Sequence, residues 1–203
     1  MNIDKVVITL RRTPDRLRWF QGVNPTWATS FRTMHGYDGL ELTNFLGPSR
    51  LVSQSTLNSW TPGAIGAALS HLHCWRQCAD RGEPMLIAED DAVLACDLMA
   101  QLQNLAGLLD DRWDIVLLGW NYNSLLHCED SEGIQSMQLF EPAFPDLRQL
   151  RKIVNTDRQR ELCRLKHAFG LPAYLITPLG ARRLLAELPP LRSSPLHIGR
   201  GIP

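Results

Sequence analysis

The chain has 203 residues, with 21 Lys and Arg against 21 Asp and Glu, and 44% of its residues are hydrophobic. This length is enough to bury a hydrophobic core, and the balanced charge argues against a nucleic-acid-binding protein. No apolar run approaches the roughly 20 residues that are needed to cross a bilayer. These bounds favour one globular domain, with or without a short appendage.

The charges are unevenly distributed along the chain. Before residue 148 lie 18 of the acidic residues, whereas 11 of the basic residues lie at or after it. A basic C-terminal quarter suggests contact with an anionic surface, and a solvated helix face explains it equally well. The five cysteines have no framework spacing, and the N-terminus has no signal-peptide pattern. Both features indicate a reduced, cytoplasmic setting.

Strand-like and helix-like patterns alternate along the chain. We expect strands over residues 6–10, 31–39, 85–88, 113–120 and 173–177. We expect helices from Pro14, from Thr61 to Gly82, and over 97–109, 147–168 (as one helix or two) and 179–188, with loops over 40–61 and 128–146. The alternation predicts an α/β fold with a mainly parallel sheet, as one domain over 1–188 and a tail over 189–203.

Three carboxylates, Glu89, Asp90 and Asp91, follow the buried run 85–88 directly. Ligand sites in open α/β sheets lie at the C-terminal ends of the strands. Adjacent carboxylates repel one another, and a bound Mg²⁺ or Mn²⁺ would offset the repulsion. In an extended strand Glu89 and Asp91 point to one side and Asp90 to the other. The alternative is a solvated acidic turn that caps the next helix.

Arg12 and Arg16 flank the start of the helix at Pro14. A strand, a short basic loop and a helix N-terminus together can hold a phosphate or a nucleotide. There is no glycine-rich loop, so neither a P-loop nor a dinucleotide fingerprint is present. Surface solvation is the alternative explanation for both arginines.

The helix from Thr61 carries small residues in its first half, which allow close approach of another backbone or of a ligand. His71, Cys74 and Cys78 share one face of this helix and form a conceivable Zn²⁺ half-site. The preferred interpretation is that the two cysteines are small buried hydrophobic residues, since no nearby motif offers further ligands.

Six segments, taken in order, resemble glycosyltransferase family 25. This family comprises the lipopolysaccharide and lipooligosaccharide glycosyltransferases of Gram-negative bacteria and the related collagen galactosyltransferases. The matching segments are Val7–Arg12 with Asp15-Arg16, Tyr37-Asp38-Gly39, Gly63–Gly66 with Leu69–His71 and Trp75, Leu86–Asp91, Asp114–Gly119, and Ala173–Thr177 with Gly180-Ala181.

The resemblance implies a GT-A-like, Rossmann-type fold that binds a nucleotide sugar. It implies a metal-dependent, inverting transfer of a hexose, often galactose, from a UDP-sugar to a lipopolysaccharide or oligosaccharide acceptor, usually with Mn²⁺. With the basic C-terminal quarter, this resemblance predicts a cytoplasmic enzyme that makes peripheral contact with the anionic inner membrane. The implied site residues are Glu89 and Asp91 at the metal, Asp90 at the metal and diphosphate, Arg12 and Arg16 near the nucleotide, Asp38 in a donor-side turn, and Ser70 and His71 facing the site.

The general base that an inverting reaction needs is not identified by the sequence. Asp91 and Asp38 are the expected catalytic residues, and Asp114 is a weaker candidate for the base. The chain departs from the family at residues 194–197, where Ser194-Pro195-Leu196-His197 stands in place of a Pro-x-Asp motif, and His197 could be a late metal ligand. Two alternatives therefore stay open: a non-catalytic relative that binds a nucleotide or glycolipid, and a Mg²⁺-dependent nucleotidyl- or phosphotransferase.

Overall fold

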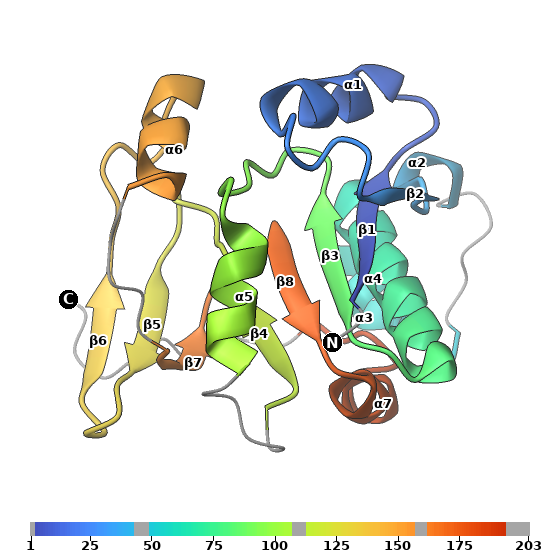
Figure 1. Cartoon of the computed structure of the whole chain (residues 1–203). Helices are drawn as coiled ribbons and strands as arrows, with labels where there is room; N and C mark the ends of the chain where they lie inside the picture. The colour runs from blue at the N-terminus through green and yellow to red at the C-terminus, as the bar shows by residue number, and fades with distance from the viewer. Residues whose placement is uncertain (1–2, 43–48, 107–112, 157–161, 194–203) are drawn as a thin grey trace.

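The structure, a computed structural model, describes residues 3–42, 49–106, 113–156 and 162–193 (Figure 1). The main sheet has the strand order β2-β1-β3-β8-β4, and a second sheet has the order β6-β5-β7. The strands are β1 Asp4–Thr9, β2 Arg32–His35, β3 Met85–Glu89, β4 Ile115–Leu117, β5 Leu126–Glu129, β6 Gln135–Gln138, β7 Arg164–His167 and β8 Ala173–Ile176. The helices are α1 Pro14–Val23, α2 Gly39–Leu42, α3 Gln54–Ser59, α4 Pro62–Arg81, α5 Leu98–Ala106, α6 Leu147–Val154 and α7 Pro178–Glu187.

Four strands of the main sheet run in one direction. Strand β1 is parallel to β2 and to β3, whereas β8 is antiparallel to both of its neighbours, β3 and β4. The α/β class with a mainly parallel sheet is therefore confirmed. The finer expectation of a GT-A-like, Rossmann-type arrangement stays a prediction.

Helices cover both faces of the main sheet, and each face has its own hydrophobic cluster. Met85 and Ile87 of β3 belong to the cluster shared with α4 and α7. Leu86 and Ala88 belong to the cluster shared with α1 and α5. Figure 1 shows the same layers, with α4 and α5 on opposite sides of β3. An unbroken apolar run suits a strand that is buried on both faces, as the sequence predicted.

Helix α4 begins and ends where the sequence predicted. The Thr61 hydroxyl accepts a hydrogen bond from Ala64 N, which satisfies one free N–H of the first turn. Gly82 ends the helix with a φ of 70°, a left-handed conformation that glycine adopts without strain. The small residues of α4 let another backbone segment pack closely against the helix. A Cβ on Gly66 would lie 2.5 Å from the carbonyl oxygen of Tyr37.

Three segments differ from the sequence-based expectation. The expected loop over 40–61 contains part of α2 and all of α3, and its residues 43–48 lie outside the described residues. The expected loop over 128–146 contains the end of β5 and all of β6, and the expected helix over 147–168 ends at Val154 and is followed by β7.

The second sheet escaped prediction because each of its strands is only four residues long and β6 is polar. All four residues of β6 are exposed, so the alternation that marks a half-buried strand is missing. The turn between β5 and β6 is instead fixed by Asp130, whose carboxylate accepts hydrogen bonds from Glu132 N and Ile134 N, and by Gly133 at a φ of 81°.

The expected tail begins with an attachment to the body of the molecule. Leu191 N donates to Leu51 O over 2.8 Å, and Leu191 O accepts from Ser53 N and from the Thr56 hydroxyl. Residues 194–197, with the departure from the family pattern, lie outside the described residues. No helix in the described ranges is long and apolar enough to cross a membrane.

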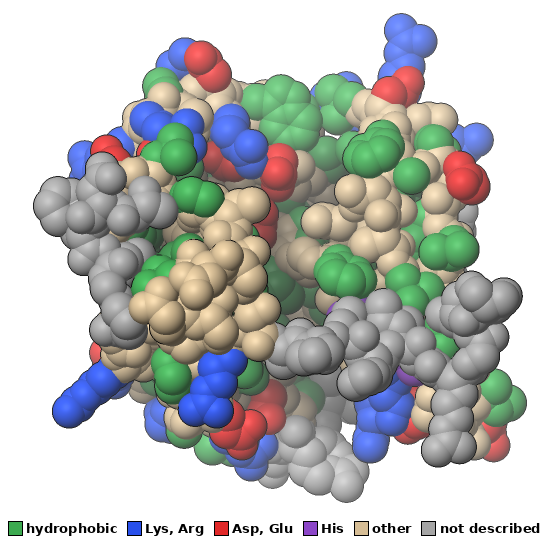
Figure 2. All heavy atoms as spheres, turned by 180° about the vertical axis from the view of Figure 1, so that it is seen from behind, with side chains coloured by type: hydrophobic (Ala, Val, Ile, Leu, Met, Phe, Trp, Pro, Cys, Tyr) green, Lys and Arg blue, Asp and Glu red, His purple; other side chains and the backbone are tan. Residues whose placement is uncertain are grey.

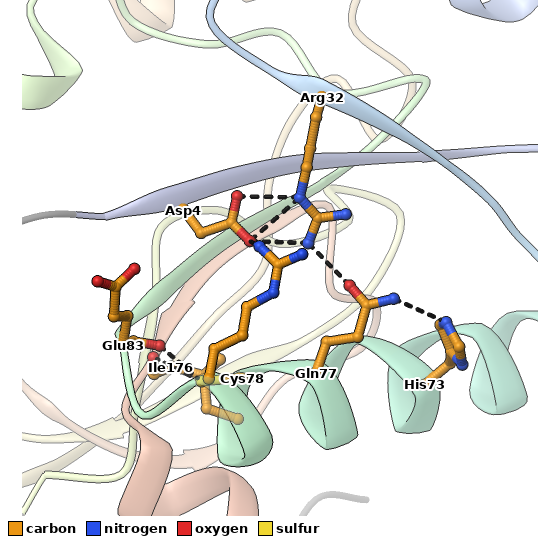
Figure 3. Close-up of polar contacts among 8 residues, drawn as sticks. Asp4, Arg32, His73, Gln77, Cys78, Glu83 and Ile176 are labelled. Carbon is orange, nitrogen blue, oxygen red and sulfur yellow. Dashed lines mark hydrogen bonds and ion pairs between the residues drawn. The ribbon is translucent and has the colours of Figure 1, made fainter.

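An ionic cluster joins β1, β2 and α4 at the edge where the strands β1 and β2 begin (Figure 3). Asp4 accepts hydrogen bonds from Arg32 over 2.7 Å and from Arg81 over 2.8 Å, and Arg32 also donates to Gln77. The pKa of Asp4 is lowered, first by its hydrogen bond with Arg32. This carboxylate therefore stabilises the fold wherever it is ionised.

We expect Asp4→Asn to lower the free energy of unfolding at neutral pH by about 1 kcal/mol, a value discounted for solvent screening. Because the pKa of Asp4 is lower in the folded protein, the difference from the unchanged protein should be full above pH 3.8, the ordinary aspartate value, and should vanish as the pH falls below it. Urea unfolding at several pH values measures this. A difference that does not change with pH would contradict the account.

Candidate functional site

The three predicted acids lie at the C-terminal end of β3. Glu89 is the last residue of β3 and is aligned with Ile8 of β1, so the acids and Thr9 share one edge of the sheet. Seen from behind, the surface is hollowed between the part covered by α4 and the part formed by the second sheet, with acidic side chains beside the hollow (Figure 2). This edge is where ligands bind in open α/β sheets.

Asp90 is buried and both of its carboxylate oxygens accept hydrogen bonds. The Thr9 hydroxyl donates to Oδ2 over 2.7 Å, and Arg16 Nε donates to Oδ1 over 2.7 Å. Only 5% of Asp90 is exposed. A buried carboxylate with this set of donors is a fixed structural anion, and its oxygens are already in use.

Arg16 joins Asp90 to Asp91. Its Nη2 donates to Asp91 Oδ2 over 2.9 Å, and the pKa of Arg16 is raised, first by the hydrogen bond to Asp90. The expected alternation held for Glu89 and Asp90, which face opposite sides. For Asp91 the expectation stays a prediction: β3 ends at Glu89, and Asp91 lies in the following turn, where it reaches the same guanidinium as Asp90.

The site carries excess negative charge, because Arg16 is one positive charge paired with two carboxylates, Asp90 and Asp91, and Glu89 adds a third carboxylate at the end of β3. The pKa of Asp91 is raised, first because the surrounding protein displaces water from the carboxylate and next because of repulsion by Glu89. More than half of the Asp91 side chain is nevertheless open to solvent, at 57%. This arrangement suits a cation or a cationic ligand at the exposed side of Glu89 and Asp91.

Two buried side chains hold the segment that follows the acids. Asn24, at the end of α1, donates to Ala92 O and accepts from Leu94 N over 2.7 Å. The Trp27 indole N–H donates to Ala95 O over 2.9 Å. The turn at the acids is therefore anchored on the same helix that supplies Arg16.

Glu89 faces α4, where it meets His71. The distance between His71 Nε2 and Glu89 Oε1 is 3.2 Å, and His71 Nδ1 lies 2.8 Å from the hydroxyl oxygen of Tyr174. His71 is 6% exposed. The sequence placed His71 at the site, and the structure brings it against Glu89 from the buried side.

Arg12 and Asp38 form an ion pair that joins the segment before α1 to the start of α2. Asp38 also accepts a hydrogen bond from Leu40 N, so each of its carboxylate oxygens has a donor. The Arg12 side chain is half exposed. Asp38 thus ties its own loop, which leads into α2, to Arg12. Its expected catalytic role stays a prediction.

Ser70 is buried and holds the same loop against α4. Its hydroxyl donates to Gly66 O over 2.7 Å and accepts from Tyr37 N over 2.8 Å. A Cβ on Gly36 would lie 2.7 Å from this hydroxyl oxygen. Ser70 therefore positions the Tyr37-Asp38 turn, and its expected contact with a donor stays a prediction.

The expected divalent cation would have two carboxylates, Glu89 and Asp91, as its ligands at this edge, and it stays a prediction. No group of three or more His, Cys, Asp or Glu residues that could hold a metal occurs within the described ranges. Glu89 and Asp91 each have one oxygen to which no described residue donates, whereas both oxygens of Asp90 are taken. Mg²⁺ and similar cations often use one or two carboxylates and complete their coordination with substrate phosphates and water.

Two candidate roles from the sequence are not supported by the geometry. Cys74 and Cys78 are fully buried, and burial raises the pKa of their thiols to about 12 and about 11, so both are protonated and poor Zn²⁺ ligands. Asp114 precedes β4 at the opposite edge of the sheet and pairs with Arg183 over 2.8 Å, so it is not placed to act as the base.

Comparison with known protein families adds an independent finding. The sequence model of glycosyltransferase family 25, described as an LPS biosynthesis protein, matches residues 2–196. The match covers both sheets and every residue of the acidic edge.

We expect opposite effects on stability from neutralising the two neighbouring aspartates. Asp90→Asn should lower the free energy of unfolding by about 2 kcal/mol, because the buried Thr9 hydroxyl and the half-exposed Arg16 guanidinium lose their anionic acceptor. Asp91→Asn should leave it unchanged or raise it, because it relieves repulsion by Glu89. Thermal unfolding of both variants measures this. Equal losses would contradict the assigned roles.

Proposed function

Because the chain belongs to glycosyltransferase family 25, it is a glycosyltransferase of lipopolysaccharide biosynthesis, and we propose that it transfers a hexose from a UDP-sugar. The enzyme therefore uses a sugar donor and an oligosaccharide acceptor. Galactose is the hexose that we propose first. The observation that carries the proposal is the acidic edge, where Glu89 ends β3 against His71 and Arg16 pairs with both Asp90 and Asp91.

The donor diphosphate is proposed to bind above the C-terminal ends of β1 and β3. Glu89 and Asp91 would hold Mn²⁺ or Mg²⁺ through their two unengaged oxygens, and the diphosphate would complete the coordination. When bound, the cation supplies Lewis-acid stabilisation of the negative charge on the departing diphosphate. Arg12, which is half exposed, would contact the nucleotide.

Within this proposal the protein's own residues have separate tasks. Asp90 and Arg16 fix the turn, so that Asp91 is presented at a constant position. Asp38 and Ser70 hold the loop that carries Tyr37 against α4. Preorganised charges of this kind lower a barrier because they need no rearrangement as the reaction proceeds. We propose inversion at the anomeric carbon as the stereochemical outcome.

The acceptor side is proposed to lie toward α6. Asn155, at the end of α6, accepts a hydrogen bond from Cys96 N over 3.3 Å, so α6 lies beside the segment that follows the acids. Arg148, Arg151 and Lys152 on α6 are exposed, and no residue of α6 is buried. A basic helix at this place would favour peripheral contact with the anionic inner membrane, where a glycolipid acceptor is held.

We expect release and transfer of hexose from a UDP-hexose in the presence of Mn²⁺. Asp91→Asn should lower kcat/KM at least about a hundredfold, the equivalent of about 2.7 kcal/mol, because the cation loses one of two carboxylates. Glu132→Gln, at the exposed turn between β5 and β6, is the matched control and should keep the activity. The measurement is UDP release with and without a chelator.

Two outcomes would contradict the proposal. Protection of the fold by a nucleoside triphosphate but by no UDP-sugar would favour a nucleotidyl- or phosphotransferase. Metal-dependent UDP binding without hydrolysis or transfer would favour a non-catalytic relative. Thermal-shift titrations with UDP, UDP-galactose, UDP-glucose and ATP, each with and without Mn²⁺, separate these cases.

A further inference from the structure

A continuous row of hydrogen bonds runs from the buried side of α4 to Glu89. The Trp75 indole N–H donates to the Tyr174 hydroxyl oxygen over 2.8 Å. The same oxygen lies 2.8 Å from His71 Nδ1, and His71 Nε2 lies 3.2 Å from Glu89 Oε1. The row joins α4, β8 and the last residue of β3, and it extends beyond the contact between Tyr174 and His71 to Trp75.

Only one assignment of donors and acceptors lets every polar hydrogen in this row form a hydrogen bond. An indole N–H can only donate, so the Tyr174 oxygen must accept from Trp75. Tyr174 has a single O–H, and His71 Nδ1 is the acceptor within reach among the described residues. If His71 Nδ1 carried the proton instead, the fully buried Tyr174 O–H would lose its acceptor, which is costly in a protein interior.

This direction fixes the state of the imidazole. With Nδ1 accepting from Tyr174, the ring proton must be on Nε2, and Nε2–H then donates to Glu89 Oε1. Oε1 of Glu89 is thereby occupied from the buried side, and no described residue donates to Oε2. The carboxylate is held in one orientation by a partner that is itself held by two buried aromatic side chains.

The fold makes this arrangement rigid. Tyr174 is aligned with Ile87 across the antiparallel pair β3–β8, and its side chain is completely buried. His71 and Tyr174 also pack ring against ring, with centroids 5.5 Å apart. Because β8 runs against its neighbours, its first residues reach the edge at which β3 ends, and Pro172 O accepts from Glu89 N over 2.9 Å.

We propose that Tyr174 and Trp75 are positioning residues, which lock His71 in its Nε2–H form so that Glu89 offers a single, oriented oxygen to a ligand at the acidic edge. The ligand class, a cation that bridges to a donor diphosphate, rests on the proposed function. The locked imidazole does not, because it follows from hydrogen bonds within the protein. Glu89 would accordingly bind the cation through one oxygen.

The direct test is the protonation pattern of His71, read by nitrogen NMR of the ligand-free protein with labelled histidine. We expect a neutral ring protonated at Nε2, and Tyr174→Phe should replace this single form by a mixture. Tyr122→Phe, which removes a phenol hydroxyl outside the row, is the matched control and should leave the His71 signals unchanged. A His71 protonated at Nδ1 in the unchanged protein would overturn the proposal, whether or not any variant folds.

The consequence for the site is tested with Mn²⁺ alone and with Mn²⁺ and UDP. Tyr174→Phe should weaken Mn²⁺ binding 10–100-fold, the usual effect of losing a residue that orients a metal ligand. Unchanged Mn²⁺ affinity in a folded Tyr174→Phe protein would overturn the positioning role. If the unchanged protein binds no Mn²⁺ while His71 is protonated at Nε2, the proposed metal site fails and the locked imidazole stands.

Discussion

The structure depends on how three adjacent carboxylates are accommodated at the end of a buried strand. Ionised groups in such a place repel one another and are costly to remove from water. One of them, Asp90, is paired with the Arg16 guanidinium and accepts a hydrogen bond from the Thr9 hydroxyl, so it is part of the protein framework. Glu89 and Asp91 retain free oxygens at the surface. The division turns a repulsive cluster into one structural anion and two candidate ligands.

Each neighbouring element contributes to holding that division in place. Helix α1 supplies Arg16 and, through Asn24, also ties down the segment after the acids. Helix α4 presents His71 to Glu89 on one side, and its Ser70 holds the loop that carries Asp38. Small residues on α4 make the close approach possible, since a side chain at Gly66 would collide with the Tyr37 carbonyl. Rigid elements therefore fix the candidate site from both faces of the sheet.

The sequence predicted the acidic edge and helix α4 because both depend on local patterns: an apolar run before the acids, and the caps Thr61 and Gly82. It could not predict the partners of the acids. Thr9 and Asp90 are 81 residues apart, and His71 and Tyr174 are 103 apart. The order of strands in the sheet brings the members of each pair together. Thr9, for example, meets Asp90 because β1 ends at Thr9 and lies beside β3. The second sheet was missed because its strands are only four residues long and because β6 is fully exposed, so the alternation of Leu126 and Cys128 in β5 is too short to stand out.

The central claim is that a cation and a nucleoside diphosphate bind at the edge formed by Glu89 and Asp91. The most direct measurement is paramagnetic broadening of backbone amide signals by Mn²⁺ in the presence of UDP. The account predicts selective loss of signals from Thr9, Arg16 and residues 89–91, and sharp signals from β5, β6 and β7. Broadening centred on the acidic turn at Asp130, or none that depends on UDP, would contradict it.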